Sequence, residues 1–406
     1  FGSKVAEQIT SWDPFDQNSH ANWFDPEWMF GVKDGFDIVI GNPPYLFGEH
    51  LKNEKEMYVT KFETARGQFD AYWLFYERDL KTLMKESSVH CFINSDAMLA
   101  RDESANLRRY ILPLCKYLLL SHVGQVFGAG VSGVVVLIVK GKGIPRYYTT
   151  VDYDESSQTF GEQRRVDIVQ VTSDPKYRLL ARADNRSDLI IKLCGYPTRF
   201  ANLFSISRGE EIGKKNLLRV TSSPPRGYVS VLAGEGIRRY CQPRPTHLVS
   251  QSKVLKSKEN YLSPKIVVVK TGKNFVAAID NDSLITLQSV YNLHPKRGVS
   301  CAFGCALLNS RLLNTFLEYR ITQQKKLFPQ ITQGNILEMP IPKFSLQLQE
   351  PFISLVDKIL SITKDGDYLD NPSKQARVKE YERQIDQMVY KLYGLTEEEI
   401  RIVEGK

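Results

Sequence analysis

The 406-residue sequence lacks the features that would place it in a membrane, secreted or zinc-bound class. No apolar run reaches about 18 residues, the length that suggests a transmembrane helix. No basic segment followed by an apolar one opens the chain, so nothing in it argues for secretion. The six cysteines form no C-x-x-C pair and the six histidines are scattered, so we expect no metal site. Reduced thiols in the cytoplasm are the simplest interpretation.

What is present is an ordinary globular composition with an uneven charge. Hydrophobic residues make up 42% and charged residues 25%, and the length predicts two or three domains. Residues 197–345 contain 22 Lys and Arg against 8 Asp and Glu, a local net charge of +14, which leaves −6 on the rest of the chain. A concentration of positive charge in one segment favours a polyanionic partner, most simply nucleic acid. The alternative is a basic domain that is merely soluble.

The most informative motif is Asn42-Pro43-Pro44-Tyr45, which follows the apolar run 36–41. The run predicts a buried strand, and two successive prolines predict a stiff turn with unpaired carbonyl groups. The turn would present an amide and an aromatic ring at the carboxyl end of a strand, where open α/β sheets bind ligands. An amide oxygen and a carbonyl can accept both hydrogens of an exocyclic amino group. The alternative is a plain strand-to-loop turn.

Alternating strand and helix patterns predict an α/β fold for the first half. We expect strands at 36–41, 88–94, 119–126 and 133–139, helices at 70–85 and 104–119, and a strand-poor stretch at 140–182. In the second half we expect a helix at 184–194, strands at 228–232, 265–270 and 275–279, a helix at 302–320 and a helical tail at 346–406. Thr396 and Glu399 have the spacing of a capping box. Cys301 and Cys305, four residues apart, predict one packed helix face.

Further segments carry a family resemblance, together with the Asn-Pro-Pro-Tyr motif: 70–75 (DAYWLF), 123–127 (VGQVF), 131–136 (VSGVVV), 231–234 (VLAG), 270–273 (KTGK) and 308–310 (LNS). Over about residues 36–342 the chain resembles the gamma class of N6-adenine DNA methyltransferases, in particular those with a TaqI-like specificity domain from restriction–modification systems. The resemblance implies a partial Rossmann-like methyltransferase sheet, then a mixed α/β target recognition domain and a helical tail. The implied domains are 1–183 (catalytic), 184–196 (connecting helix), 197–345 (recognition) and 346–406 (tail).

The resemblance also implies roles for individual residues. Asn42 and the carbonyl of Pro43, in a turn stiffened by Pro44, would hold the amino group of adenine for an in-line attack on the methyl group of S-adenosylmethionine. Tyr45 and Phe127 would stack on a flipped adenine in double-stranded DNA. Phe75 would contact the cofactor, or else be a core residue of its helix, and Phe127 could instead pack at a sheet edge. Candidates for DNA contacts, each equally a solvated surface charge, are Arg238, Arg239, Lys270, Lys273, Lys325 and Lys326.

The sequence departs from the family before the catalytic motif. Only 41 residues precede Asn42, and none form a strand, G-x-G and helix arrangement. We therefore expect a carboxyl-terminal fragment of a longer protein that binds S-adenosylmethionine poorly and is inactive alone. An upstream nuclease domain in the parent protein is left open, and no membrane partner is expected.

Two other functions stay open. One is a DNA-binding specificity module without catalysis of its own, which a steep salt dependence of DNA binding without methyl transfer would indicate. The other is a protein or RNA methyltransferase, since such enzymes also use Asn-Pro-Pro-Tyr. The basic second half favours DNA, and Tyr45 favours adenine over cytosine as the target.

Overall fold

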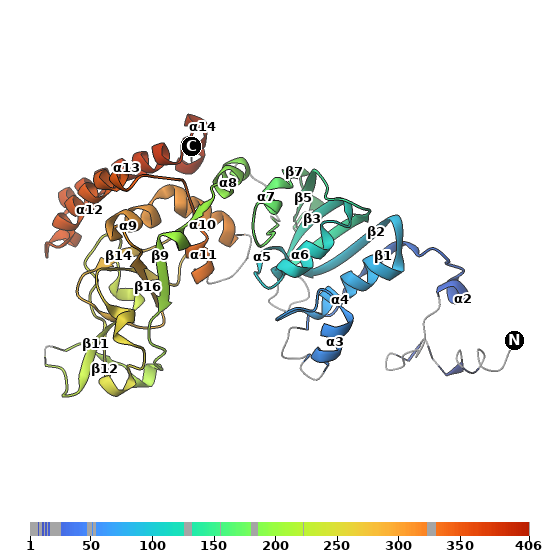
Figure 1. Cartoon of the computed structure of the whole chain (residues 1–406), viewed down its shortest axis with the longest axis horizontal. Helices are drawn as coiled ribbons and strands as arrows, with labels where there is room; N and C mark the ends of the chain where they lie inside the picture. The colour runs from blue at the N-terminus through green and yellow to red at the C-terminus, as the bar shows by residue number, and fades with distance from the viewer. Residues whose placement is uncertain are drawn as a thin grey trace. The chain divides into compact units, whose positions relative to one another are not determined.

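The computed structural model divides the chain into two compact units, each of which is described by itself (Figure 1). Unit 1 comprises residues 1–171 and 176–182, and unit 2 comprises residues 172–175 and 183–406. The structure describes residues 26–46, 54–125, 132–154, 156–179, 186–221, 223–322 and 330–405, together with the isolated positions 7, 10, 11, 13, 15, 16 and 51. Residues 184–196, expected as a connecting helix, lie in unit 2 with the basic segment and the tail.

Unit 1 is built on a seven-stranded mixed sheet in the order β1-β2-β4-β3-β5-β6, with β7 also paired to β5. β1 runs parallel to β2 and β3 runs parallel to β5, whereas the other neighbours are antiparallel. The strands are β1 (Phe36–Gly41), β2 (Met84–Ser95), β3 (Cys115–Gln125), β4 (Ser132–Lys140), β5 (Tyr147–Asp154), β6 (Thr159–Phe160) and β7 (Arg164–Asp167). The apolar β4 lies in the middle of the sheet, which explains its unbroken run of valines.

The helix that matters most to unit 1 is α4 (Ala71–Arg78), which continues as one wider helical turn over Asp79–Leu83 and leads into β2. Its buried residues include three large rings, Tyr72, Trp73 and Tyr76. The other helices of this part of the chain are short: α2 (Pro26–Phe30), α3 (Lys55–Lys61), α5 (Ala97–Ala100), α6 (Ala105–Ile111) and α7 (Val169–Thr172).

Three expectations for unit 1 are wrong in part. The strand 36–41 forms, but it is not buried, because it is the end strand of the described sheet and leaves Ile38 65% and Ile40 77% exposed. The helix expected at 104–119 ends at Ile111, since Pro113 cannot continue a helix and the apolar residues from Cys115 pair with β4 instead. The stretch 140–182 contains β5 to β7 rather than few strands.

Unit 2 contains two four-stranded sheets, ordered β10-β12-β11-β15 and β14-β13-β16-β9. A small antiparallel pair, β8 with β17, accompanies them. The strands are β8 (Thr198–Arg199), β9 (Phe204–Arg208), β10 (Leu218–Arg219), β11 (Tyr228–Leu232), β12 (His247–Ser250), β13 (Lys265–Val269), β14 (Ala277–Asp280), β15 (Ile285–Thr286), β16 (Val290–Pro295) and β17 (Pro340–Ile341). The strands expected at 228–232, 265–270 and 275–279 correspond to β11, β13 and β14.

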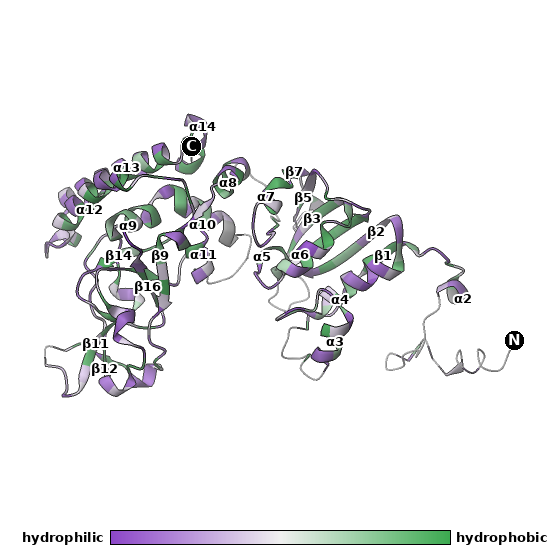
Figure 2. Ribbon diagram, viewed as in Figure 1, coloured by the Kyte–Doolittle hydropathy of each residue, from purple (hydrophilic) through white to green (hydrophobic). Residues whose placement is uncertain are grey.

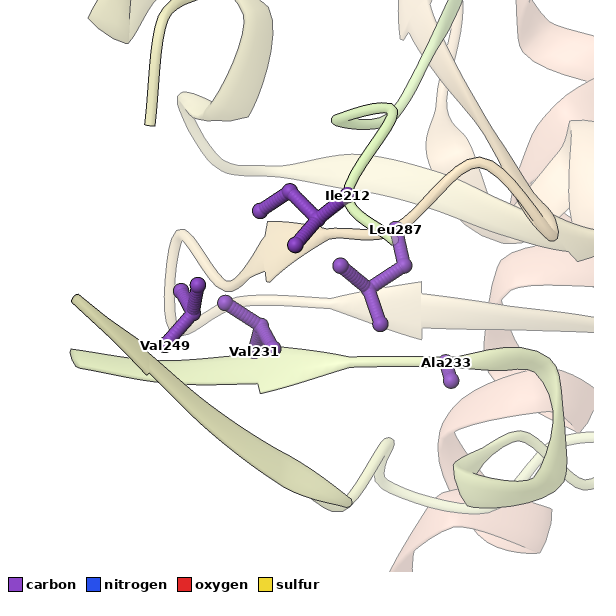
Figure 3. Packing of buried hydrophobic residues seen from close by; sticks show 5 residues of the cluster. All are labelled: Ile212, Val231, Ala233, Val249 and Leu287. Carbon is purple, nitrogen blue, oxygen red and sulfur yellow. The ribbon is translucent and has the colours of Figure 1, made fainter. Parts of the chain in front are cut away.

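Two small apolar clusters hold these sheets. Figure 3 shows one of them, in which Ile212, Val231, Ala233, Val249 and Leu287 meet from β11, β12 and the neighbouring loops. The second contains Leu232, Ile237, Val267, Ala278 and Val290. Because Val231 and Leu232 are successive residues on β11, they face opposite sides and join both clusters.

The helices of unit 2 are α8 (Ser187–Cys194), α9 (Cys301–Asn309), α10 (Arg311–Thr322), α11 (Gln333–Leu337), α12 (Glu350–Thr363), α13 (Pro372–Leu392) and α14 (Glu397–Glu404). The helix expected at 302–320 is two helices separated at Ser310, which has an extended backbone. The expected helical tail is confirmed, and Figure 2 shows the alternating apolar and polar colours along α12 and α13 that accompany its packing. The Thr396–Glu399 capping box is present, and Cys301 and Cys305 are both buried in α9.

Candidate functional site

The candidate catalytic loop begins at the carboxyl end of β1, where Gly41 lies against a buried ring. A Cβ atom at Gly41 would be 3.0 Å from Phe92 Cε1 on the neighbouring strand β2. The Phe92 ring is held in turn by Tyr76 and His90, at ring-centroid distances of 5.2 and 4.0 Å. A larger residue before Asn42 would therefore have to displace the Phe92 ring by a few tenths of an ångström, which its packing against Tyr76 and His90 resists.

The loop itself alternates between exposed and covered residues. Asn42 and Pro44 are exposed, Pro43 is buried and Tyr45 is half-buried. The Asn42 amide is thus free to meet a ligand, while the turn is anchored through Pro43. Tyr45 is oriented by two contacts: its hydroxyl donates a hydrogen bond of 3.0 Å to the carbonyl of Ile93, and its ring meets the Tyr72 ring edge-on at 6.3 Å.

Asp70 connects this loop to helix α4, and sequence reasoning did not single it out. It occupies the N-cap position of α4, and the next residue, Ala71, donates its backbone N–H to the carbonyl of Leu46 at 3.0 Å. The Oδ1 atom of Asp70 is buried and has no hydrogen-bond partner among the described residues. Burial raises the pKa of this carboxyl to about 6, although Arg101 and nearby backbone N–H groups act in the opposite direction. Burial, and then the charge of Asp70, raises the pKa of Tyr45.

Phe75 lies on α4 but does not belong to the core of unit 1. Its side chain is 44% exposed, whereas the flanking residues Leu74 and Tyr76 are buried. The alternative that Phe75 is a core residue is therefore wrong for this chain. An exposed ring of this size, one helical turn after Tyr72, which packs on Tyr45, can offer a face to a planar ligand.

A buried polar layer fixes α4 on β2 beneath the loop. Tyr76 on α4 donates a hydrogen bond of 2.9 Å to Oδ1 of the fully buried Asn94 on β2. In the turn that follows α4, Asp79 pairs with the buried His90 at 3.0 Å. Buried polar pairs of this kind favour one relative position of two elements, although Nδ1 of His90 has no partner among the described residues. The loop after β1 and the start of α4 therefore rest on a rigid support.

The residues predicted to contact DNA differ in their exposure and in the contacts that they already make. Arg238 and Lys273 are exposed. Arg239 is engaged within unit 2, because it donates to the carbonyl of Asn309 and lies 3.6 Å from Glu382 on α13. Lys270 is half-buried at the end of β13. Phe127, Lys325 and Lys326 lie outside the described residues.

Neither a metal centre nor a membrane span emerges from the described part of the chain. No group of three or more His, Cys, Asp or Glu side chains is arranged to hold a metal ion there. None of the helices in the described ranges is long and apolar enough to cross a membrane. The described cysteines are all free thiols.

Comparison with known proteins assigns both halves. Residues 3–127 match the model of the Eco57I restriction-modification methylase family, and residues 229–341 match that of the TaqI-like C-terminal specificity domain. The chain therefore contains an Eco57I-type restriction–modification methylase domain followed by a TaqI-like specificity domain. The expected family resemblance is thereby confirmed.

One curated relative and two solved structures illustrate the extent of the similarity. The type II restriction enzyme and methyltransferase RM.Eco57I of Escherichia coli is 31% identical over 115 residues, which is 27% of this chain and 10% of that protein. The DNA-bound type IIL restriction-modification enzyme MmeI shares the fold with a TM-score of 0.55 at 13% identity, over 90% of this chain and 56% of the other. The type IIG restriction endonuclease BpuSI matches at 13% identity with a TM-score of 0.35, over 88% of this chain and 54% of the other. The chain thus spans about a tenth of the curated relative and about half of these solved chains.

Proposed function

We propose that this restriction–modification methylase transfers a methyl group from S-adenosylmethionine to the N6 amino group of an adenine in double-stranded DNA. Unit 1 would carry the reaction and unit 2 would recognise the target. The observation that carries the proposal is the loop at residues 42–45: an exposed amide at the end of a strand, a stiff double-proline turn, and a ring fixed beside it. The whole reaction is proposed for a protein that contains this chain together with the cofactor motifs expected upstream.

The chemistry asked of the loop is mainly positioning. The Asn42 side-chain oxygen and the Pro43 carbonyl would accept the two amino hydrogens, which directs the nitrogen lone pair away from the ring. The Tyr45 ring would stack on the extruded base, and base–aromatic stacking of about 1–3 kcal/mol offsets part of the few kcal/mol that extrusion costs. The Ile93 carbonyl that holds the Tyr45 hydroxyl keeps this ring in one orientation before the base arrives.

S-Adenosylmethionine would supply an electrophilic methyl group on a sulfonium centre. The residues present fit the aromatic part of such a ligand, since Phe75 offers an exposed ring on α4. Asp70 lies at the junction of α4 and the loop, with one buried carboxylate oxygen that has no partner in the described structure. Phe127, proposed as a second stacking ring, and a cytoplasmic location are part of the same proposal.

DNA recognition is proposed for unit 2 because residues 229–341 match a specificity domain and lie within the strongly basic segment. The exposed Arg238 and Lys273 remain candidates for phosphate contacts. Arg239 is better explained as a tie between the strands and α13, given its contacts with Asn309 and Glu382.

The test is incorporation of labelled methyl groups into duplex DNA by the longer protein that contains this chain, followed by base analysis. Asn42→Ala should reduce incorporation by at least about 100-fold, since it removes a positioning contact at the reacting atom, while DNA affinity stays nearly unchanged. Asn106→Ala on α6 is a control that removes an amide from the same unit. Retained turnover in the Asn42 variant would exclude the catalytic assignment, and label in N4-methylcytosine would correct the target base. DNA binding without any label, even with the cofactor motifs present, would favour a specificity module without catalysis.

A further inference from the structure

The two four-stranded sheets of unit 2 meet where β9 and β13 end. β9 ends at Arg208, and the chain passes through Gly209 to Glu210, which forms a parallel bridge with Leu287 beside the other sheet. A Cβ atom at Gly209 would lie 2.4 Å from the backbone oxygens of Thr286 and Leu287, so only glycine fits. The backbone at Arg208 is therefore fixed by its neighbours on both sides.

Lys270 reaches the same junction from β13. Its backbone N–H donates a hydrogen bond of 2.9 Å to the carbonyl of Ser289, in the turn between β15 and β16. Its backbone carbonyl accepts a hydrogen bond of 2.8 Å from the N–H of Ile331. The Ser289 hydroxyl accepts a hydrogen bond of 3.1 Å from the backbone N–H of Gly234, just after the end of β11. Because β9 and β13 lie on either side of β16 and end at the same edge of one sheet, Arg208 and Lys270 are close enough for their charges to interact, although they are far apart in the sequence.

The charges at this junction do not balance. Arg208 lies 3.4 Å from Glu211, and its side chain is 40% exposed with an Nε atom that has no partner among the described residues. Neither an ion pair nor a hydrogen bond of the Lys270 ammonium group occurs within the described ranges. Burial and the positive charge of Arg208 lower the pKa of Lys270, and Glu211 acts in the opposite direction. Lys256 adds a third cation, since its ammonium group donates to the carbonyls of Arg208 and Gly209. Three cations therefore face two carboxylates, the buried Glu210 and the well-exposed Glu211.

Two cations that lie close together in a partly buried environment repel each other, and this repulsion raises the free energy of the charged state. A bound anion would relieve it. A phosphodiester group suits this arrangement. A guanidinium group can bind two phosphate oxygens at once, and an ammonium group adds a point charge. Because the backbone at Arg208 and Lys270 is held by its neighbours, binding of a phosphate would require only their side chains to become ordered.

We propose that Arg208 and Lys270 form a binding site for a DNA phosphate at the junction of the two sheets of the specificity domain, with Glu211 limiting its strength. This inference rests on the proposed function, because it names where the recognition unit holds the DNA backbone. It adds Arg208, which lies outside the group of cations expected from the sequence, and it gives Glu211 an opposing role.

The experiment measures binding of the whole chain to a short fluorescent duplex of arbitrary sequence, by anisotropy, between about 50 and about 200 mM salt. Arg208→Gln should weaken binding about tenfold at the lower salt, the value of one charge-assisted hydrogen bond. It should also reduce the slope of log affinity against log salt by about one. Lys270→Gln should act in the same direction, and Glu211→Gln should strengthen binding.

The control is Arg383→Gln, which removes the same charge from an exposed position on α13 where the arginine pairs with Glu380. Equal weakening by the Arg208 and Arg383 variants would overturn the site, because it would mean that only net charge matters. The double variant Arg208→Gln, Glu211→Gln separates two causes when it is compared with the Glu211→Gln single variant. It binds about tenfold more weakly than that single variant if Arg208 holds a phosphate. It binds equally well if Arg208 serves only to neutralise Glu211, which would also overturn the site. Thermal melting checks that each variant is folded.

If the unaltered chain binds no duplex, the proposal that unit 2 recognises DNA fails, and this inference fails with it. If the chain binds and the Arg208 variant is unchanged, only the inference fails.

Discussion

The most direct quantitative prediction concerns the buried carboxyl at the base of the candidate catalytic loop. Asp70 has a pKa of about 6 in the folded chain, mainly because burial disfavours its charged form, against an ordinary value of 3.8. The folded state therefore binds a proton more readily than the unfolded state, so the free energy of unfolding falls as pH rises from about 4 to about 6. A difference of about two pKa units corresponds to at most about 3 kcal/mol, and because the carboxyl keeps some contact with water we expect ~1–2 kcal/mol.

Asp70→Asn removes this charge and keeps the shape. The variant should be more stable than the original chain by ~1–2 kcal/mol at pH 7, and the two should become equal near pH 4. All four tryptophans of the sequence, Trp73 among them, lie in unit 1, so urea unfolding followed by tryptophan fluorescence reports on this unit alone. The Glu103→Gln variant, at an exposed position of the same unit, is the control.

Two results would refute this reasoning. If the Asp70 variant is less stable at pH 7, the carboxylate makes stronger contacts with the loop than its buried, unpaired oxygen indicates. If the stability difference does not change between pH 4 and pH 7, the carboxyl has no raised pKa. In a protein with the proposed methyltransferase activity, the same variant tests whether the charge supports catalysis, because a stabilised but slower enzyme would show that the charge is kept for activity.

Two further predictions concern single residues in the cores. Gly41→Ala should destabilise unit 1 by about 1–3 kcal/mol, because the added methyl group meets the packed Phe92 ring at 3.0 Å. Urea unfolding followed by tryptophan fluorescence measures this loss, and an unchanged midpoint would show that the ring can move aside. Asp280→Ala should lower the free energy of unfolding of unit 2 by about 3–5 kcal/mol, since it leaves the fully buried Lys265 ammonium group without its carboxylate. Circular dichroism during unfolding measures the loss. A loss below about 1 kcal/mol would mean that the backbone carbonyls of Tyr261 and Leu284 are sufficient partners.

Local patterns in the sequence are enough to predict the elements that carry the candidate catalytic loop. The apolar run 36–41, the double proline and the helix after Asp70 each involve a few adjacent residues, and the structure has β1 and α4 at these positions. Exposure of β1 could not be predicted in the same way, because it depends on which strands flank it. The strand β5 escaped prediction because Tyr147–Asp154 is rich in Thr and Tyr and reads as polar, yet its middle residues are buried between β3 and β7.

The candidate site residues also differ in whether neighbouring residues in the sequence are enough to predict them. Asn42 and Tyr45 are adjacent to a strand end, so the motif alone suggests their role. Arg208 and Lys270 are separated by 61 intervening residues and come close only because β9 and β13 lie on either side of β16 in one sheet. Asp70 looks like an ordinary helix N-cap in the sequence, and its raised pKa arises from burial by the loop and α4, which no local pattern reveals. Charge density indicated which segment should contact DNA, but not which cations are already engaged, as Arg239 is.

The exposed edge of β1 has a practical consequence for anyone who handles this chain. Within the described structure β1 pairs on one side only, and Ile38 and Ile40 present apolar side chains beside the unpaired backbone groups of the other edge. Such an edge is a template onto which another strand can add, including the same strand from a second molecule. Concentrated preparations of the isolated chain are therefore expected to self-associate through β1, next to the loop that begins at Asn42. A lysine in place of Ile38 would discourage this association without altering the loop.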